Sequence, residues 1–323
     1  AAVASCGALS VWFECTNGVL QDGDPREVDP EDWVGFGVQH MVETRIYCGR
    51  PYCARCGKWG SETHQRRAGR LARAVWGVRV GKWVVTLPPE DLALIGDRAD
   101  VSSMMPIVAR VVMRLHGAPG AFVLVHWRGE NTQGIHFEVI FPHDGKRVRQ
   151  GELYAMREDL AEELGLQRLP TARFTTTWES LSEERQAKKW WHMVRYACHP
   201  SIPAAWIVSA EPEEVARVIG MASGFRAIRG YGCWSDRRVR DESLQESVRK
   251  LYPMPEGMGG RPREVVIAAG VPCPVVGCLG MLQHDAVHRA LGSGEEIAPG
   301  VYVYVVDLAR RAEARGALSL SAL

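Results

Sequence analysis

The segment between residues 121 and 141 constrains the fold more than any other part of the chain. It contains two apolar runs, AFVLVHW at 121–127 and IHFEVIF at 135–141, joined by the polar connection RGENTQG. Short runs rich in β-branched and aromatic residues, separated by a loop with Gly and Asn, predict an antiparallel β-hairpin. Such a hairpin belongs to an antiparallel sheet whose apolar surface must be covered by other elements.

Helical and extended segments alternate around this hairpin. Periodicity and end signals predict further strands at 82–87 and 301–306 and helices at 61–76, 102–116, 150–164, 182–198 and 211–221. The parallel strand–helix–strand rhythm does not occur, and the 46% apolar and 24% charged residues are typical of a globular chain. We therefore expect an α+β fold: an antiparallel sheet with helices packed on one face, plus small zinc-binding segments.

Composition divides the chain into three expected regions. The segment PMPEGMGGRPR at 253–263 is the strongest linker candidate. We expect an N-terminal zinc-binding region with a basic helix at 1–80, a central domain at 81–250 and a C-terminal region at 251–323. The sequence has no apolar run of membrane-spanning length, and residues 1–7 lack the features of a signal peptide. We expect a cytoplasmic protein without a membrane partner.

A cysteine cluster predicts a structural zinc site. Three cysteines lie within nine residues: Cys48, Cys53 and Cys56. In a reducing compartment, thiolates at this spacing bind one tetrahedral ion, and the site stabilises the fold. The fourth ligand stays open between His64, which we favour, His40 and Cys15; three ordinary reduced cysteines in a turn are the alternative.

A second group of potential zinc ligands lies near the C-terminus. It consists of Cys273, Cys278, His284 and His288. The residue types suit zinc, but the inner loop is shorter than in a common finger. The alternative is a small loop whose cysteines happen to lie near each other.

The predicted hairpin carries a candidate site for a hard divalent ion. Side chains alternate across a strand, so His136 and Glu138 face the same side. His126 lies roughly opposite His136 if the hairpin closes near Asn131. An imidazole and carboxylate set favours Mn²⁺ or Mg²⁺. The alternative is a half-buried strand with polar outer positions.

The helix predicted near residue 190 carries a candidate nucleophile. Lys189, His192, Tyr196 and His199 follow a spacing that places them along one helix face. A tyrosine hydroxyl beside cationic and imidazole groups can attack a phosphate. The alternative is an amphipathic helix whose Tyr196 packs into the core.

Together these segments resemble rolling-circle replication initiators of the HUH class, of the single-tyrosine plasmid type, and the related insertion-sequence transposases. The run CGRPYCARC at 48–56 resembles their cysteine motif, and KWVVTL at 82–87 resembles their first nuclease motif. His126 with GIHFEV at 134–139 resembles the second, histidine-containing motif, and VRYACH at 194–199 resembles the third, which carries the catalytic tyrosine. The resemblance covers roughly residues 45–240 and implies an HUH endonuclease-like domain at 81–250.

The chain departs from this family at three positions. Glu138 replaces the second histidine of the metal motif, and a carboxylate still binds a hard ion. His199 stands where a lysine often follows the tyrosine. His192 stands where some initiators have a glutamate that activates water, and an imidazole can act as the same general base.

The resemblance implies an enzyme that nicks and rejoins single-stranded DNA at a replication origin through a 5′-phosphotyrosine. Tyr196 is then the nucleophile, with His192 and His199 as catalytic partners and Mn²⁺ or Mg²⁺ on His136, Glu138 and His126. A host helicase and polymerase are further implied partners.

The net charge of +1 gives no global attraction to DNA, so contacts must be local. The candidate DNA-binding residues are Arg66, Arg67, Arg70, Arg73, Lys189 and Arg195. Trp190 and Trp191 are candidates for base stacking.

Three alternatives stay open from the sequence. A transposase or relaxase would use the same chemistry. A zinc-containing DNA-binding protein with an inactive nuclease core is the second, and the Glu138 change supports it. A zinc protein unrelated to DNA is the third, which the nearly neutral charge allows.

Overall fold

A computed structural model of the chain describes residues 9–15, 38–45, 53, 55–56, 58–128, 134–176, 181–254, 261, 282–289, 295–298 and 301–307. The chain divides into two compact units, one formed by residues 1–48 with 264–323 and the other by residues 49–263. This division differs from the three consecutive regions expected above. The physical reason is that strands from the two ends of the chain pair with each other in one sheet.

The first unit contains a five-stranded sheet in the order β8-β1-β2-β10-β9. Its strands are β1 (Leu9–Cys15), β2 (Val38–Arg45), β8 (Leu282–Arg289), β9 (Glu295–Ala298) and β10 (Val301–Asp307). All four pairings are antiparallel. The expected last strand is present as β10, which pairs over its whole length with residues 38–44 of β2.

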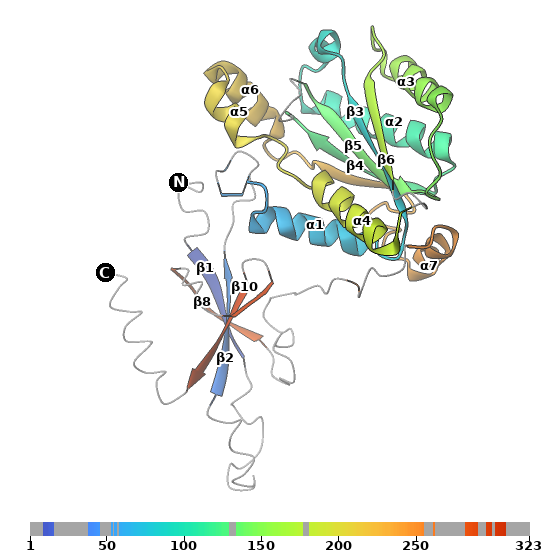
Figure 1. The fold of residues 1–323 in the computed structure, drawn as a ribbon. Coiled ribbons are helices and arrows are strands. Elements are labelled where there is room, and N and C mark those ends of the chain that lie inside the picture. The colour runs from blue at the N-terminus through green and yellow to red at the C-terminus, as the bar shows by residue number, and fades with distance from the viewer. Residues whose placement is uncertain are drawn as a thin grey trace. The chain divides into compact units, whose positions relative to one another are not determined.

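The second unit contains another five-stranded antiparallel sheet, in the order β6-β3-β5-β4-β7 (Figure 1). Its strands are β3 (Val80–Thr86), β4 (Gly120–His126), β5 (His136–Pro142), β6 (Thr171–Thr176) and β7 (Ile228–Gly232). The predicted hairpin is confirmed, since β4 and β5 pair antiparallel with His126 opposite His136.

Helices cover both faces of this second sheet. They are α1 (Glu62–Ala74), α2 (Arg98–His116), α3 (Gln150–Leu164), α4 (Glu183–Ala197), α5 (Ala204–Ser209), α6 (Pro212–Ala222) and α7 (Glu242–Leu251), with a 3₁₀ turn η3 (Pro89–Leu94). Trp83, Phe137 and Val139 pack with α2, α3 and α6, whereas Phe122 and Ile140 pack with α1, α4 and α7.

The expectation of helices on one face was therefore wrong. Every residue of β4 and β5 is buried, so neither side of these two central strands faces water. Apolar side chains on both surfaces of a strand require a cover on both surfaces. The sheet is consequently the middle layer of three, with α2 and α3 on one side and α1 and α4 on the other (Figure 1).

The helix ends follow local chemistry. Ser61 caps α1 by accepting a hydrogen bond from the His64 amide, as its sequence position predicts. Helix α2 starts four residues earlier than expected because Asp97 and Asp100 form a reciprocal capping box. It ends at Gly117, whose φ of 59° is left-handed. Among the described helices, none is both long enough and apolar enough to cross a bilayer.

Candidate metal centre

Four side chains converge on the sheet face that α1 and α4 cover. His126 on β4 lies opposite His136 on β5, and Glu138 follows two residues later on the same side of β5. Phe137 and Val139, between and beyond them, point into the core on the opposite face. Strand alternation and the hairpin register therefore bring these three groups together, as the sequence predicts.

His199 joins this group from the segment that follows α4. The carbonyl oxygen of Ser201 accepts backbone hydrogen bonds from Trp127 (2.9 Å) and Arg128 (3.1 Å), which ties the segment to the end of β4. His126 Nε2 also lies 3.1 Å from the carbonyl oxygen of Ala197, at the last turn of α4. These contacts hold the C-terminal end of α4 against the hairpin, and Pro200 prevents the helix from continuing into it.

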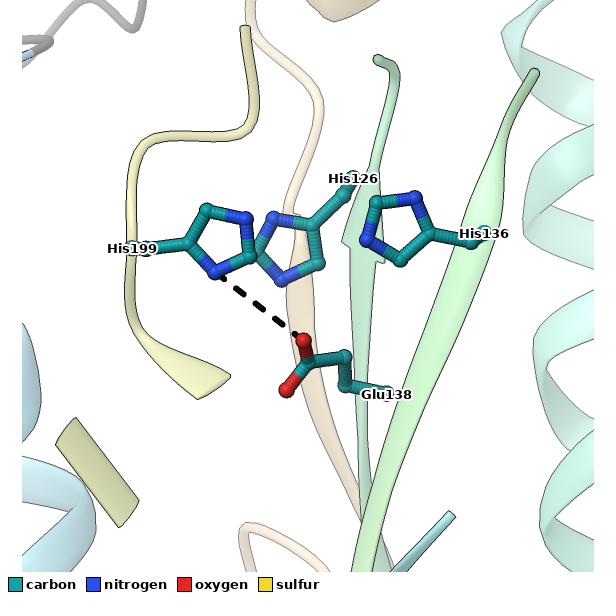
Figure 2. Close-up of side chains that lie close together, drawn as sticks. All are labelled: His126, His136, Glu138 and His199. Carbon is teal, nitrogen blue, oxygen red and sulfur yellow. Dashed lines mark ion pairs between the residues drawn. The ribbon is translucent and has the colours of Figure 1, made fainter. Parts of the chain in front are cut away.

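The four groups are close enough to share one ion. One potential ligand atom from each of His126, His136, Glu138 and His199 lies within 4.8 Å of the others. The imidazole of His126 stacks on that of His199 with ring centroids 3.8 Å apart, and on that of His136 at 4.9 Å. Figure 2 shows the three rings side by side, with the Glu138 carboxylate beside them and 3.9 Å between its Oε1 and Nδ1 of His199.

The hydrogen-bonding pattern fits a bound cation. Three atoms of this group are buried without a hydrogen-bond partner: His126 Nδ1, His136 Nδ1 and Glu138 Oε1. A carbonyl oxygen can only accept, so the bond from His126 Nε2 to Ala197 leaves the lone pair on Nδ1. Orienting one ring nitrogen through a backbone carbonyl is how proteins prepare the other as a ligand. Because buried polar atoms without partners are costly, an ion that binds any of them relieves part of that cost. The cluster could therefore hold a metal ion.

Burial keeps His126 and His136 neutral, which is the form that binds metal. Burial, reinforced by the neighbouring His199 and His136, holds the pKa of His126 well below its usual value. Burial, together with His199 and Lys82, lowers the pKa of His136 to about 3. Burial raises the pKa of Glu138, while the ammonium group of Lys82 lowers it.

Lys82 also belongs to this site, although the sequence alone did not predict it there. Its Nζ lies 3.1 Å from Glu138 Oε2, and both side chains are buried. The pairing of β3 with β5 places it next to the carboxylate, with Val84 opposite Glu138 and Lys82 opposite Ile140. A lysine in an apolar strand is the only sequence signal, and it does not reveal its partner. Lys82 thus holds one carboxylate oxygen, and Oε1 faces the cluster.

Tyr196 lies at the exposed border of the cluster. Its side chain is 41% exposed, and its ring centroid is 4.9 Å from that of His199. Lys82 Nζ lies 4.2 Å from the centre of the same ring. His192, one turn earlier on α4, is exposed, and its ring is 5.8 Å from that of Tyr196. The face of α4 that the sequence predicts to carry His192 and Tyr196 is thus directed partly to the cluster and partly to solvent.

The cysteine motif lies only partly within the described residues. Cys53 and Cys56 are buried, whereas Cys48 lies outside the described residues. His64 uses both ring nitrogens: Nδ1 accepts from the Gly60 amide at 3.0 Å, and Nε2 lies 2.9 Å from the carbonyl oxygen of Arg195. Zinc binding by His64 would replace one of these bonds. The first zinc site stays a prediction.

The second zinc site also stays a prediction. Cys273 and Cys278 lie outside the described residues. His284 and His288 lie on the described backbone of β8, where they pair with Phe13 and Ser10 of β1.

The candidate DNA-binding residues differ in exposure. On α1, Arg70 is exposed, whereas Arg67 is partly buried and close to Cys56 and Cys198. Burial lowers the pKa of Lys189, and Arg195 places its guanidinium group 5.4 Å from the ring centre of Trp59. Three further candidates on these helices are partly or fully buried: Arg66, Arg73 and Trp190. Trp190 donates to the carbonyl oxygen of Val78, so its indole is part of the core.

Compared with models of protein families, with curated proteins and with solved structures, the chain matches none.

Proposed function

We propose that this chain is a metal-dependent strand-transfer enzyme that nicks and rejoins single-stranded DNA with Tyr196 as its nucleophile, as rolling-circle replication initiators of the HUH class do. One observation carries the proposal. A half-exposed tyrosine ring lies between Lys82 and His199, directly beside a buried cluster of three histidines and a glutamate. A phosphodiester at Tyr196 would therefore meet a nucleophile, a cation and metal ligands in one place.

The proposed ion is Mn²⁺ or Mg²⁺ held by His126, His136, Glu138 and His199. The mixed nitrogen and oxygen donor set, without thiolates, suits such ions better than an all-thiolate site would. When bound, the ion supplies positive charge that polarises the scissile phosphate and stabilises the charge that develops on it.

The chain's own residues then perform a transesterification. The phenol oxygen of Tyr196 forms a bond to phosphorus as the bond to the 3′ oxygen breaks, which leaves a 5′-phosphotyrosine and a 3′-hydroxyl. The phenol proton is released and the leaving oxygen gains one, so the number of phosphoester bonds is unchanged. Lys82 and Arg195 contribute positive charge near the phosphate. His192, exposed beside Tyr196, is placed to act as the general base for a later attack by water or a 3′-hydroxyl. The released 3′-hydroxyl would prime a polymerase.

The test is a polarity-resolved adduct assay. The protein is incubated with Mn²⁺ and a random-sequence pool of single-stranded oligonucleotides, labelled at either the 3′ or the 5′ end, and run on a denaturing gel. We expect the 3′ label to migrate with the protein and the 5′ label to be released on a shorter fragment. EDTA should abolish both products. Tyr196→Phe should abolish the adduct without changing DNA binding, because only the attacking hydroxyl is lost.

A matched control is Tyr154→Phe, which alters a 51% exposed tyrosine on α3, on the other side of the sheet. It should form the adduct normally. An adduct that persists in Tyr196→Phe would contradict the assignment of the nucleophile. DNA binding by the unaltered protein with no adduct at any metal concentration would contradict the enzyme and favour the non-catalytic DNA-binding protein. Sequencing the adducted DNA would separate an origin from transposon ends.

A further inference from the structure

Trp59 is an exposed tryptophan beside the proposed nucleophile. It is 42% exposed, whereas Trp83, Trp127, Trp190 and Trp234 are fully buried. Its ring centroid lies 6.0 Å from that of Tyr196 and 6.5 Å from that of His199. A large apolar ring left in water at the border of a polar site is a candidate contact for a ligand with a flat aromatic group.

Trp59 is held in place by a network of hydrogen bonds around its turn. The neighbouring Gly60 amide donates to His64 Nδ1, and the side-chain amide of Gln65 donates to the Gly60 carbonyl at 2.8 Å. His64 is buried, contacts the Trp59 ring at 4.4 Å, and bonds to the carbonyl oxygen of Arg195 on α4. Two helices therefore fix the position of the indole relative to Tyr196, so little conformational entropy is lost when a ligand binds it.

Positive charge accompanies the exposed rings. The guanidinium carbon of Arg195 lies 5.4 Å from the ring centre of Trp59, and Lys82 Nζ lies 4.2 Å from that of Tyr196. An exposed aromatic ring next to a cation is the combination that binds a base by stacking and its phosphate by charge. The separation between Trp59 and Tyr196 is one that a single nucleotide can bridge.

We propose that Trp59 stacks on the unpaired base next to the scissile phosphate, with Arg195 binding the backbone phosphate of that nucleotide. This rests on the proposed function, since it assumes that single-stranded DNA reaches Tyr196. In this arrangement the turn between the cysteine motif and α1 contacts the substrate directly. Base stacking tolerates any sequence, so Trp59 contributes to affinity and to the position of the phosphate and does not select the base.

The experiment measures the affinity of Trp59→Ala, Trp59→Phe and Trp191→Ala for the same random-sequence single-stranded pool. Fluorescence anisotropy is recorded in EDTA, where no cleavage occurs, over a range of salt concentrations. We expect Trp59→Ala to weaken binding by about 5- to 150-fold, the range for loss of one base–aromatic stack. Trp59→Phe should keep most of the affinity. Arg195→Gln should lower the slope of affinity against salt by about one, whereas Trp59→Ala should leave the slope unchanged.

Trp191→Ala is the matched control. Trp191 is 40% exposed and lies on the same helix as Tyr196. Equal affinity of Trp59→Ala and the unaltered protein, with the adduct still formed, would overturn this inference and leave the proposed function intact. Equal losses in Trp59→Ala and Trp191→Ala would also overturn it. If the unaltered protein binds no single-stranded DNA, both proposals fail. Trp59→Phe keeps the test valid if Trp59→Ala does not fold.

Discussion

Two groups of histidines lie on opposite faces of the same sheet and differ in how their nitrogens are used. His126, His136 and His199 lie on the face covered by α1 and α4. His116 and His143 lie on the other face, beside Trp83, with ring centroids 5.3 Å apart. Burial lowers the pKa in both groups, for example of His116 to about 4 and of His136 to about 3.

The second group is satisfied by its own surroundings. Trp83 Nε1 donates to His116 Nε2 at 2.9 Å, and the Gly145 amide donates to His143 Nδ1 at 3.0 Å. Phe141 and Phe174 stack on His116 at 4.5 Å and 5.8 Å. These imidazoles serve packing and accept hydrogen bonds from neighbours.

The first group keeps lone pairs that no neighbour uses. His126 Nδ1, His136 Nδ1 and Glu138 Oε1 are all buried without a hydrogen-bond partner, and the side chains that carry them lie close together (Figure 2). The difference between the two faces is therefore not the number of buried imidazoles. It is the combination of unused polar atoms with a carboxylate, which a bound cation can satisfy together.

The largest expected effect comes from Lys82→Met. Removing one partner of a buried ion pair leaves Glu138 without its counter-charge, which typically costs about 3–5 kcal/mol. We expect the free energy of unfolding in urea to fall by about that amount in EDTA. The loss should be smaller in saturating Mn²⁺, because the ion then compensates Glu138. Lys188→Met, which removes an exposed pair with Glu184, is the control and should cost less than about 1 kcal/mol. An equal loss with and without Mn²⁺ would count against an ion at Glu138.

The next effect separates the two histidine groups directly. Glu138→Gln removes a proposed ligand charge, and even residues that only orient ligands change metal affinity by about 10–100-fold. We expect Mn²⁺ affinity, measured by isothermal titration calorimetry, to fall by at least about 100-fold in Glu138→Gln. His143→Gln on the other face should bind Mn²⁺ as the unaltered protein does. If His143→Gln lowered Mn²⁺ affinity and Glu138→Gln did not, the ion would bind on the face that carries His116 and His143.

The smallest effect tests the packing role of the other face. His116→Leu leaves the buried Trp83 N–H without its acceptor, which costs about 1–3 kcal/mol of unfolding free energy at neutral pH. Metal affinity should not change. Because the pKa of His116 is about 4 in the folded chain and about 6.5 when unfolded, protonation favours unfolding. Its contribution to stability is therefore complete above about pH 6.5 and is lost as the pH falls towards 4.

The measurement for this last prediction is urea denaturation at several pH values. The difference in unfolding free energy between the unaltered protein and His116→Leu should be largest at neutral pH and shrink below pH 6.5. A difference that is constant with pH would show that His116 does not titrate as its buried position indicates.

Local sequence determined the hairpin and the residues that it presents. Alternation in IHFEVIF fixes His136 and Glu138 on one side of β5, and the apolar runs on either side of the connection fix their pairing with His126. The spacing on α4 likewise placed His192 and Tyr196 one turn apart on the helix, whereas His199 lies just beyond its end at Ala197. These are short-range properties, set by backbone geometry within a few residues.

Only the tertiary structure decided what these residues meet. Lys82 joins Glu138 because β3 inserts beside β5, and Trp59 joins Tyr196 because His64 bonds across to α4. Strands β6 and β7 are not among the strands expected from the sequence, and they become edge strands through pairing with β3 and β4. Long-range pairing and the helices on both faces depend on which surfaces can be buried against each other. No local pattern records that choice, because it is made by contacts between residues far apart in the chain.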